Sequence, residues 1–308
     1  MSVLDARGLA KNFGETRALR GIDLRVEPGE IFGLIGPDGA GKTTALRLLV
    51  GVLNADAGTA NVAGFDVARE AESVREHVGY MPQQFALYGD LTVAENMRFF
   101  ADMYFVPKRE REERLARLYA FSRLEPFARR PAGKLSGGMQ KKLALSCNMI
   151  HQPALLLLDE PTTGVDPVSR RELWEILYAF AAQGVAIVVS TPYMDEAERC
   201  HRVGLIHAGR LLVVDTPRAV IDGHAETIIE RVGDENARAR TILAKCAEFA
   251  DVYPFGDALH IAARPGVDAL GVIRETLAAA GIEPGDARRV RPTFEDVFMA
   301  RIREAEHD

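Results

Sequence analysis

The sequence contains no apolar run long enough to form a transmembrane helix. Its longest apolar segments lie in "PALLLLDEP" and "VAIVVSTP", and both fall far short of the roughly 20 residues that span a bilayer. No basic stretch followed by an apolar segment opens the chain, which argues against a secretory leader. We therefore expect a chain that does not cross a membrane by itself and that works in the cytoplasm.

Cysteine and excess charge are also scarce. The three cysteines, Cys147, Cys200 and Cys246, are odd in number and have no metal-ligand spacing, which is typical of reduced intracellular thiols. Lysine and arginine number 38 against 44 acidic residues, which gives a net charge of −6. Because nucleic-acid-binding proteins usually carry a basic surface, we expect no nucleic-acid partner.

Apolar material for a core is abundant. Hydrophobic residues make up 47% of the 308 residues and charged residues 27%, which is the composition of a folded globular protein. A chain of this length exceeds the usual size of one compact core. Two domains are therefore the default expectation.

Buried strands alternate with helices along the first two thirds of the chain. Segments 31–36, 154–161 and 185–191 are apolar and strand-length, whereas 42–53 and 167–184 have the apolar spacing of helices. Between about 90 and 150 the pattern is helical throughout. This order predicts a three-layer α/β core with a helical insertion in its middle.

The pattern changes after about residue 222. Strand-like segments at 226–232, 251–255, 258–263 and 287–292 enclose helix-like segments at 234–249 and 267–281. The order βαββαβ favours a small ferredoxin-like α+β domain. We therefore predict one domain over 1–221 and an accessory domain over 222–308.

The segment "GPDGAGKT" stands between a predicted strand and a predicted helix, and it matches the phosphate-binding pattern G-x-x-x-x-G-K-[ST]. Its glycines let backbone N–H groups surround phosphates, the lysine reaches the outer phosphates, and the hydroxyl can bind Mg²⁺. A glycine-rich turn with a chance lysine is the alternative, and the strand and helix on either side disfavour it. The candidate nucleotide-binding residues here are Gly36, Pro37, Asp38, Gly39, Ala40, Gly41, Lys42, Thr43 and Thr44.

A second acidic motif, "LLLLDEP", closes a predicted buried strand. Ligands bind at the carboxyl ends of strands in α/β folds, so Asp159 is placed to hold Mg²⁺ together with Thr43. Glu160 is the candidate to polarise an attacking water. An acidic pair can equally cap a helix or end a strand in solvent, but the glycine loop upstream favours the nucleotide site.

The segment "LSGGMQKKL" resembles the signature motif of the ABC-type ATPases. Ser136 is a candidate N-cap, and Gly137 and Gly138 allow a phosphate to approach the start of the following helix. The resemblance identifies three further residues. Phe13 corresponds to the aromatic on which adenine stacks, Gln83 to the glutamine that touches Mg²⁺ and water, and Asp166 to the aspartate that couples two nucleotide sites across a dimer.

The resemblance implies fold, cofactors and partners. It implies an α/β P-loop NTPase core of the ABC ATPase type, with an antiparallel β subdomain and a helical subdomain over about 88–152. It also implies that ATP and Mg²⁺ bind with Lys42, Gln83 and Glu160 as the catalytic residues. A second ATP-binding domain would complete the site, and a membrane-spanning partner would dock in a groove beside Gln83, for which "QQFALY" and "MRFFADMYF" are candidates.

The segments "GYMPQ…LYGDLTVAEN" and "GVDPVSRRELW" further resemble the ATPases of ABC-2 type exporters, in particular the amino-terminal half of tandem-ATPase drug exporters. Such a chain would work on the cytoplasmic face of the membrane with ABC-2 type permease subunits. Its second ATP-binding domain would be another copy, a different subunit or a fused half. Two alternatives are a soluble ABC ATPase without a transport role and a regulatory nucleotide-binding module with little turnover.

One position departs from this family. ABC ATPases carry a histidine directly after "ST", where it contacts the γ-phosphate, and this chain has Pro192 there. Proline has neither a side-chain donor nor a backbone N–H. Either the site is degenerate and hydrolyses ATP slowly, or a neighbour such as Tyr193 takes over, and we favour degeneracy. The acidic stretch that follows indicates the start of a helix.

Overall fold

The computed structural model describes residues 2–84 and 87–307. The chain divides into two compact units, Met1–Pro217 and Arg218–Asp308. The boundary that we expected from the sequence lay after residue 221. The residues that we predicted for the nucleotide site run from Phe13 to Asp166, so all of them belong to the first unit.

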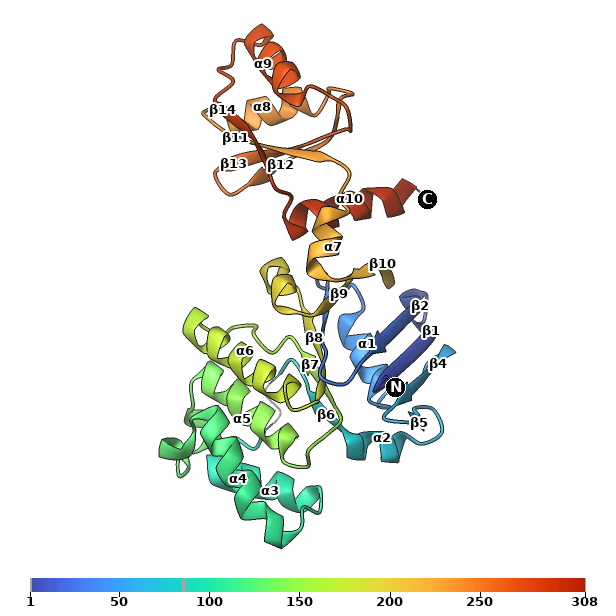
Figure 1. The fold of residues 1–308 in the computed structure, drawn as a ribbon, viewed down its shortest axis with the longest axis vertical. Helices are drawn as coiled ribbons and strands as arrows, with labels where there is room; N and C mark the ends of the chain where they lie inside the picture. The colour runs from blue at the N-terminus through green and yellow to red at the C-terminus, as the bar shows by residue number, and fades with distance from the viewer. Residues whose placement is uncertain (1, 85–86, 308) are drawn as a thin grey trace. The chain divides into compact units, whose positions relative to one another are not determined.

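A six-stranded sheet forms the centre of the first unit, in the order β10-β9-β3-β8-β7-β6 (Figure 1). Its strands β3, β6, β7, β8 and β9 run parallel, and only β10 is antiparallel to its neighbour. Their bounds are β3 Ile31–Ile35, β6 Val78–Met81, β7 Leu155–Asp159, β8 Ala186–Thr191, β9 Arg202–His207 and β10 Arg210–Asp215. Every residue of β3, β7 and β8 is buried, which explains why these strands appear in the sequence as apolar runs without alternation.

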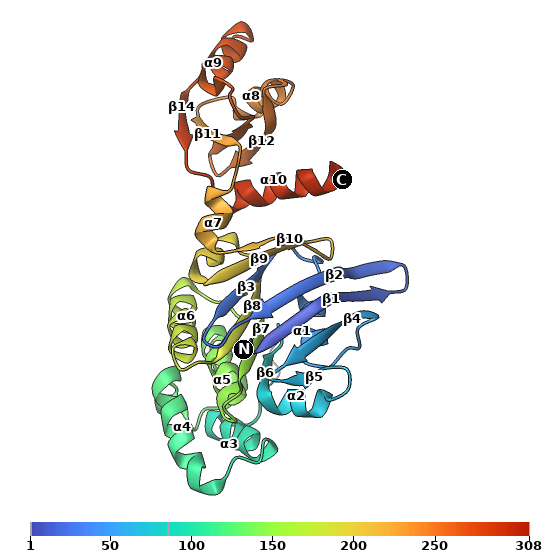
Figure 2. The ribbon, with the colours of Figure 1, turned by 45° about the vertical axis from the view of Figure 1, so that its right-hand side comes forward.

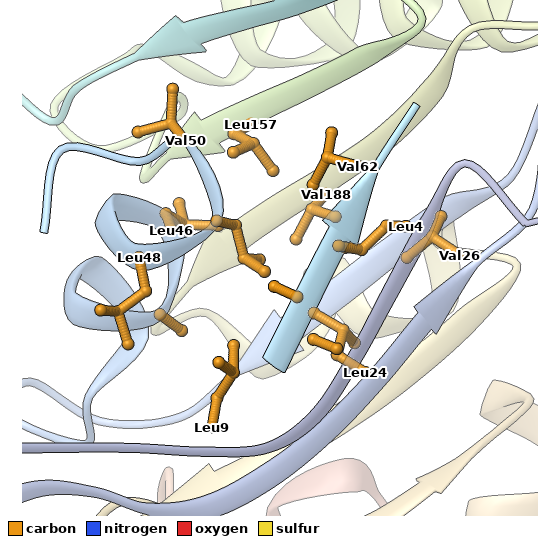
Figure 3. Packing of buried hydrophobic residues seen from close by; sticks show 14 of the residues in the cluster. Leu4, Leu9, Leu24, Val26, Leu46, Leu48, Val50, Val62, Leu157 and Val188 are labelled. Carbon is orange, nitrogen blue, oxygen red and sulfur yellow. The ribbon is translucent and has the colours of Figure 1, made fainter. Parts of the chain in front are cut away.

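A second, antiparallel sheet has the order β2-β1-β4-β5. It comprises β1 Leu4–Phe13, β2 Thr16–Val26, β4 Ala57–Val62 and β5 Phe65–Asp66. Helix α1, Lys42–Leu49, packs between this sheet and the central one, and side chains from all three form one core, which includes Leu4, Leu46 and Val188 (Figure 3). This packing holds the start of α1 at the carboxyl end of β3.

Helices α3, α4 and α5 lie beside one another, away from the antiparallel sheet (Figure 2). They span Val93–Met103, Lys108–Ser122 and Gly137–Met149, which confirms the predicted helical insertion. Thr92 and Glu95 form a capping box at the start of α3. Helix α6, Pro167–Ala181, packs against β3 and β8 on the side of the central sheet away from α1 (Figure 1). The acidic stretch after Pro192 forms only a 3-10 helix, η3, over Met194–Arg199. Helix α2, Ala71–His77, precedes β6.

The second unit contains a four-stranded antiparallel sheet in the order β12-β13-β11-β14. Helix α7, Pro217–Asp222, begins at the last residue of the first unit, and the elements that follow it are β11 Thr227–Val232, α8 Asn236–Leu243, β12 Phe249–Phe255, β13 Ala258–Ala263, α9 Ala269–Ala279, β14 Asp286–Val290 and α10 Phe294–His307. This order and pairing are the ferredoxin-like arrangement predicted from the sequence. Helix α8 ends earlier than the predicted segment 234–249, because Phe249 is buried as the first residue of β12.

Candidate functional site

The glycine-rich segment turns tightly between β3 and α1. A side chain on Gly36 would collide with the backbone oxygen of Ile206, and Gly41 has a φ of 108°, which favours glycine. Lys42 is only 4% exposed, and its ammonium donates to the backbone oxygens of Gly36 at 2.8 Å and Pro37 at 3.0 Å. The lysine is therefore held over the loop that it follows.

Two carboxylates at the end of β7 face this loop. Asp159 Oδ1 accepts a hydrogen bond from Thr43 Oγ1 at 3.1 Å. Glu160 Oε1 lies 3.4 Å from Lys42 Nζ, and Glu160 Oε2 accepts from Gln83 Nε2 at 2.8 Å. The structure thus brings together Lys42, Thr43, Gln83 and both acids, although Gln83 and Glu160 stand 77 positions apart.

Glu160 adopts a left-handed backbone conformation with a φ of 48°, which is uncommon for a residue other than glycine. Its backbone N–H donates to the carbonyl oxygen and to the hydroxyl of Ser190, both at 3.1 Å. Ser190 Oγ also donates to Asp159 Oδ1 at 2.7 Å, and Thr163 Oγ1 donates to Glu160 Oε2 at 3.2 Å. The sequence analysis did not identify Ser190 or Thr163, and the only available signal for Ser190 was its place at the end of a predicted parallel strand.

An open cleft of ≈ 700 Å³ lies over the glycine-rich segment. Asp38, Gly39, Gly41, Lys42, Thr43, Thr44, Gln83 and Glu160 line it, together with Thr16 and Arg17 at the start of β2. Phe13 at the end of β1 is 49% exposed, and its ring centroid lies 5.7 Å from Lys11 Nζ. Phe13 is not part of this lining.

The signature segment forms the start of α5. Ser136 caps this helix by accepting a hydrogen bond from the backbone N–H of Met139 at 3.4 Å, and Ser136 and Gly137 are exposed. Gly138 is buried, and a Cβ there would lie only 2.5 Å from the side chain of Ser169 in α6. Its missing side chain is therefore required by packing within the chain, a reason that the sequence did not reveal.

Asp166 is exposed and caps α6. Its carboxylate accepts hydrogen bonds from the backbone N–H groups of Val168 at 3.1 Å and Ser169 at 3.0 Å. These bonds, led by the one from Ser169, lower the pKa of Asp166 below its ordinary value. Neither Asp166 nor the start of α5 lines the cleft of the same chain within the described residues.

Pro192 directly follows β8. The next backbone N–H, that of Tyr193, donates to Thr191 Oγ1 at 3.1 Å. The ring of Tyr193 lies under the guanidinium of Arg170 in α6, 4.5 Å from ring centroid to guanidinium carbon. Tyr193 therefore contacts α6 rather than the described lining of the cleft.

Comparison with known proteins defines the class of this chain. The sequence profile of the ABC transporter family matches residues 19–163. The chain is 38% identical over 304 residues to the daunorubicin resistance ATP-binding protein DrrA2 of Streptomyces coeruleorubidus, an alignment that covers 96% of this chain and 93% of that protein. The chain therefore belongs to the ABC transporter family and carries the ATP-binding domain of that class of protein.

Two further comparisons agree with this class. The chain is 47% identical over 221 residues, 71% of its length, to the probable multidrug ABC transporter ATP-binding protein YbhF of Escherichia coli strain K12, and it spans 38% of that relative's length. A solved ATP-binding subunit of an ABC transporter superimposes with a TM-score of 0.66 at 30% identity, over 72% of this chain and 92% of that one. The predicted ABC ATPase fold is confirmed. In the described part of the chain, no helix has both the length and the apolar character that crossing a membrane requires.

Proposed function

We propose that the chain hydrolyses MgATP to energise an ABC-2 type exporter from the cytoplasmic face of the membrane. The observation that carries this proposal is the convergence of Lys42, Thr43 and Glu160 on one cleft, with 3.4 Å between Lys42 Nζ and Glu160 Oε1. The buried Asp159 is joined to them by its 3.1 Å hydrogen bond from Thr43. The drug-related names of the two relatives support the exporter branch.

The loop offers a cradle for the phosphates of ATP. Backbone N–H groups at the start of α1 and the positive end of this helix favour negative charge. Lys42 would exchange the backbone oxygens of Gly36 and Pro37 for the outer phosphates, since a charge-assisted bond is stronger than a bond to a neutral carbonyl. Phe13, at the exposed end of β1, is the candidate to stack on adenine.

The donor set beside the loop fits Mg²⁺. Thr43 supplies a hydroxyl, Asp159 a carboxylate and Gln83 an amide, and Mg²⁺ prefers such oxygen ligands while keeping substrate phosphate and water in its shell. When bound, the ion would neutralise charge that develops on the phosphates. Ser190 orients the carboxylate of Asp159 through its 2.7 Å hydrogen bond.

Glu160 is the residue that we assign to the attacking water. Gln83 and Thr163 each donate to its Oε2, at 2.8 Å and 3.2 Å, and thereby fix the direction of the carboxylate. Positioning of the nucleophile supplies much of the rate in phosphoryl transfer. An isosteric Glu160→Gln change should abolish turnover while leaving ATP binding intact.

Pro192 is the reason that we propose slow hydrolysis at this site. Proline offers no hydrogen-bond donor to the γ-phosphate. Tyr193 is an unsuitable replacement, because its ring stacks under Arg170 and would have to leave that contact. The same observation favours the alternative of a regulatory module with little turnover, which the assay below separates from an exporter ATPase.

A mostly apolar groove of ≈ 230 Å³ is the proposed docking site of the membrane-spanning permease. Tyr80, Pro82, Phe100 and Tyr104 line it beside the segment that contains Gln83. Phe85 and Ala86 of the sequence segment "QQFALY" lie outside the described residues, so this part of the predicted groove stays a prediction. Neighbouring rings of Tyr88 and Phe99, 52% and 38% exposed, extend the apolar surface.

The exposed start of α5 and the cap of α6 are the proposed contacts with a second ATP-binding domain. Ser136, Gly137 and Asp166 are accessible and do not line the chain's own described cleft. A second domain could therefore place its nucleotide against them. This domain would be another copy, a different subunit or a fused half.

The proposed function is tested by measuring ATP turnover with and without the permease in the same membrane preparation. We expect slow turnover that the permease stimulates and that Glu160→Gln abolishes. Turnover that the permease does not change would favour the regulatory module. Absence of MgATP binding in the parent chain would contradict both functions.

A further inference from the structure

Glu196 is a fully buried acid in η3, just after Pro192. One carboxylate oxygen, Oε2, accepts a hydrogen bond from Thr162 Oγ1 at 3.1 Å, and the other, Oε1, accepts from Trp174 Nε1 at 3.3 Å. The guanidinium of Arg170 is the nearby positive charge, with its Nε 3.7 Å from Oε1. Burying a carboxylate is costly unless it is paired and hydrogen-bonded, so these partners determine where Glu196 can lie.

The two hydrogen bonds lead to different parts of the first unit. Trp174 belongs to α6 and connects Glu196 to a helix that covers the sheet. Thr162 is fully buried in the turn that follows β7, two residues after Glu160. Only the bond from Thr162 therefore connects Glu196 with the backbone that carries Glu160.

This turn holds Glu160 in its left-handed conformation. The backbone N–H of Thr163 donates to the carbonyl oxygen of Glu160 at 3.3 Å, and its hydroxyl donates to the carboxylate of Glu160 at 3.2 Å. A strained backbone persists only where surrounding contacts over-determine it. The buried bond between Thr162 and Glu196 holds the residue just before Thr163 in the same turn.

We propose that Glu196 is a positioning residue for ATP hydrolysis, which acts through Thr162 to hold the turn of Glu160 against the segment after Pro192. This inference rests on the proposed catalytic role of Glu160. The connection joins residues that are 34 positions apart and involves no side chain at position 192. It therefore keeps the end of β7 and the segment after β8 connected in a chain that has proline in place of a histidine.

The two donors to Glu196 provide a matched pair of variants. Thr162→Val and Trp174→Phe each remove one hydrogen bond to the same buried carboxylate, and both should lower the melting temperature. Only Thr162→Val releases the turn of Glu160. The loss of one net hydrogen bond lowers the population of the positioned turn by about threefold to tenfold, so we expect a similar fall in kcat with an unchanged KM for ATP.

Two readouts on the full-length protein make the test independent of fast turnover. The first is single-turnover ATP hydrolysis with excess protein, and the second is amide hydrogen exchange, without nucleotide, in peptides that contain residues 160–163. We expect Thr162→Val to lower the rate and speed exchange in these peptides, whereas Trp174→Phe keeps the parent values in both. Thr162→Ser should recover most of the rate because it keeps the hydroxyl. Should Thr162→Val not fold, Thr162→Cys with its weak S–H donor takes its place.

The outcomes separate this inference from the proposed function. If Thr162→Val and Trp174→Phe change kcat and exchange equally, or if neither changes them, Glu196 has only a structural role and the inference is overturned. If the parent binds no ATP, or if Glu160→Gln hydrolyses as fast as the parent, the proposed function itself is wrong. Faster exchange at residues 160–163 in Thr162→Val alone would still support the connection to the turn.

Discussion

Replacement of Pro192 by histidine tests what limits hydrolysis at this site. The carboxylate of Glu160 already has donors in Gln83 and Thr163, and Lys42 lies 3.4 Å from it. According to our proposal, the group that the site lacks is one donor aimed at the γ-phosphate from the end of β8. One oriented transition-state donor contributes about 2.7–4 kcal/mol, or roughly 10²–10³ in rate.

The structure also indicates how much of this contribution is recoverable. Tyr193 is held by its backbone hydrogen bond to Thr191 and by its stacking under Arg170. An imidazole at position 192 must therefore adopt its rotamer on a backbone that suits proline, and an off-rotamer side chain costs about 0.5–1.5 kcal/mol. Roughly 1–3.5 kcal/mol remains, so we expect Pro192→His to hydrolyse ATP about fivefold to several hundredfold faster than the parent.

The assay compares phosphate release under single-turnover conditions in four proteins: the parent, Pro192→His, Pro192→Ala and Pro192→His combined with Glu160→Gln. Pro192→Ala separates the removal of proline from the gain of an imidazole, and we expect it to match the parent. A fast parent whose rate the histidine does not change would refute the degenerate-site reasoning. A double variant as active as Pro192→His would contradict the catalytic role that we propose for Glu160.

Four further outcomes follow from contacts in the two units. Lys42→Ala removes the ammonium from the loop. It should weaken binding of a fluorescent ATP analogue by about tenfold to a hundredfold, since a charged hydrogen bond contributes roughly 1.5–3 kcal/mol. Unchanged affinity would contradict the proposal that this loop binds the phosphates of ATP. Gly138→Ala should lower the free energy of unfolding by about 1–3 kcal/mol through overpacking, and a second change, Ser169→Gly, should restore it in chemical denaturation. Deletion of residues 223–308 should leave ATP affinity within about threefold of the parent value, or roughly 0.7 kcal/mol, and a larger loss would place part of the site in the second unit. In the second unit, burial by itself raises the pKa of Asp296, but hydrogen bonds from His260, Tyr253 and Thr293 outweigh it and lower the pKa to about 2. Because the folded-state pKa is depressed, the carboxylate contributes stability above about pH 4, and this contribution is lost toward pH 2. Asp296→Asn should therefore flatten the acid limb of a curve of melting temperature against pH.

The local sequence by itself indicated the buried strands, most of the helices and the glycine-rich loop. Apolar runs of strand length predicted β3, β7 and β8 because both faces of a parallel sheet are buried. The glycines and lysine of residues 36–43 predicted the loop because a chain that surrounds phosphate needs backbone without side chains and one positive charge. The ferredoxin-like order of the second unit was also readable, because periodicity and turn residues are properties of neighbouring positions.

Only the tertiary structure decided how the two candidate acids, Asp159 and Glu160, are held. Ser190 reaches Asp159 across 31 positions, and Thr162 reaches Glu196 across 34. No spacing in the sequence indicates such pairs, because adjacent strands and turns bring them together only when the sheet forms. The packing of Gly138 against Ser169 has the same origin, although the local pattern suggested a role at phosphate for this glycine.

The acidic stretch after Pro192 shows where local preference loses to tertiary context. Its composition indicates the start of a helix, yet it forms only the 3-10 helix η3 over Met194–Arg199. The buried carboxylate of Glu196 must meet both Thr162 and Trp174, and β9 begins at Arg202. Local sequence determines which conformations a segment prefers, whereas burial of a charge and the closure of a sheet decide which of them the folded chain adopts.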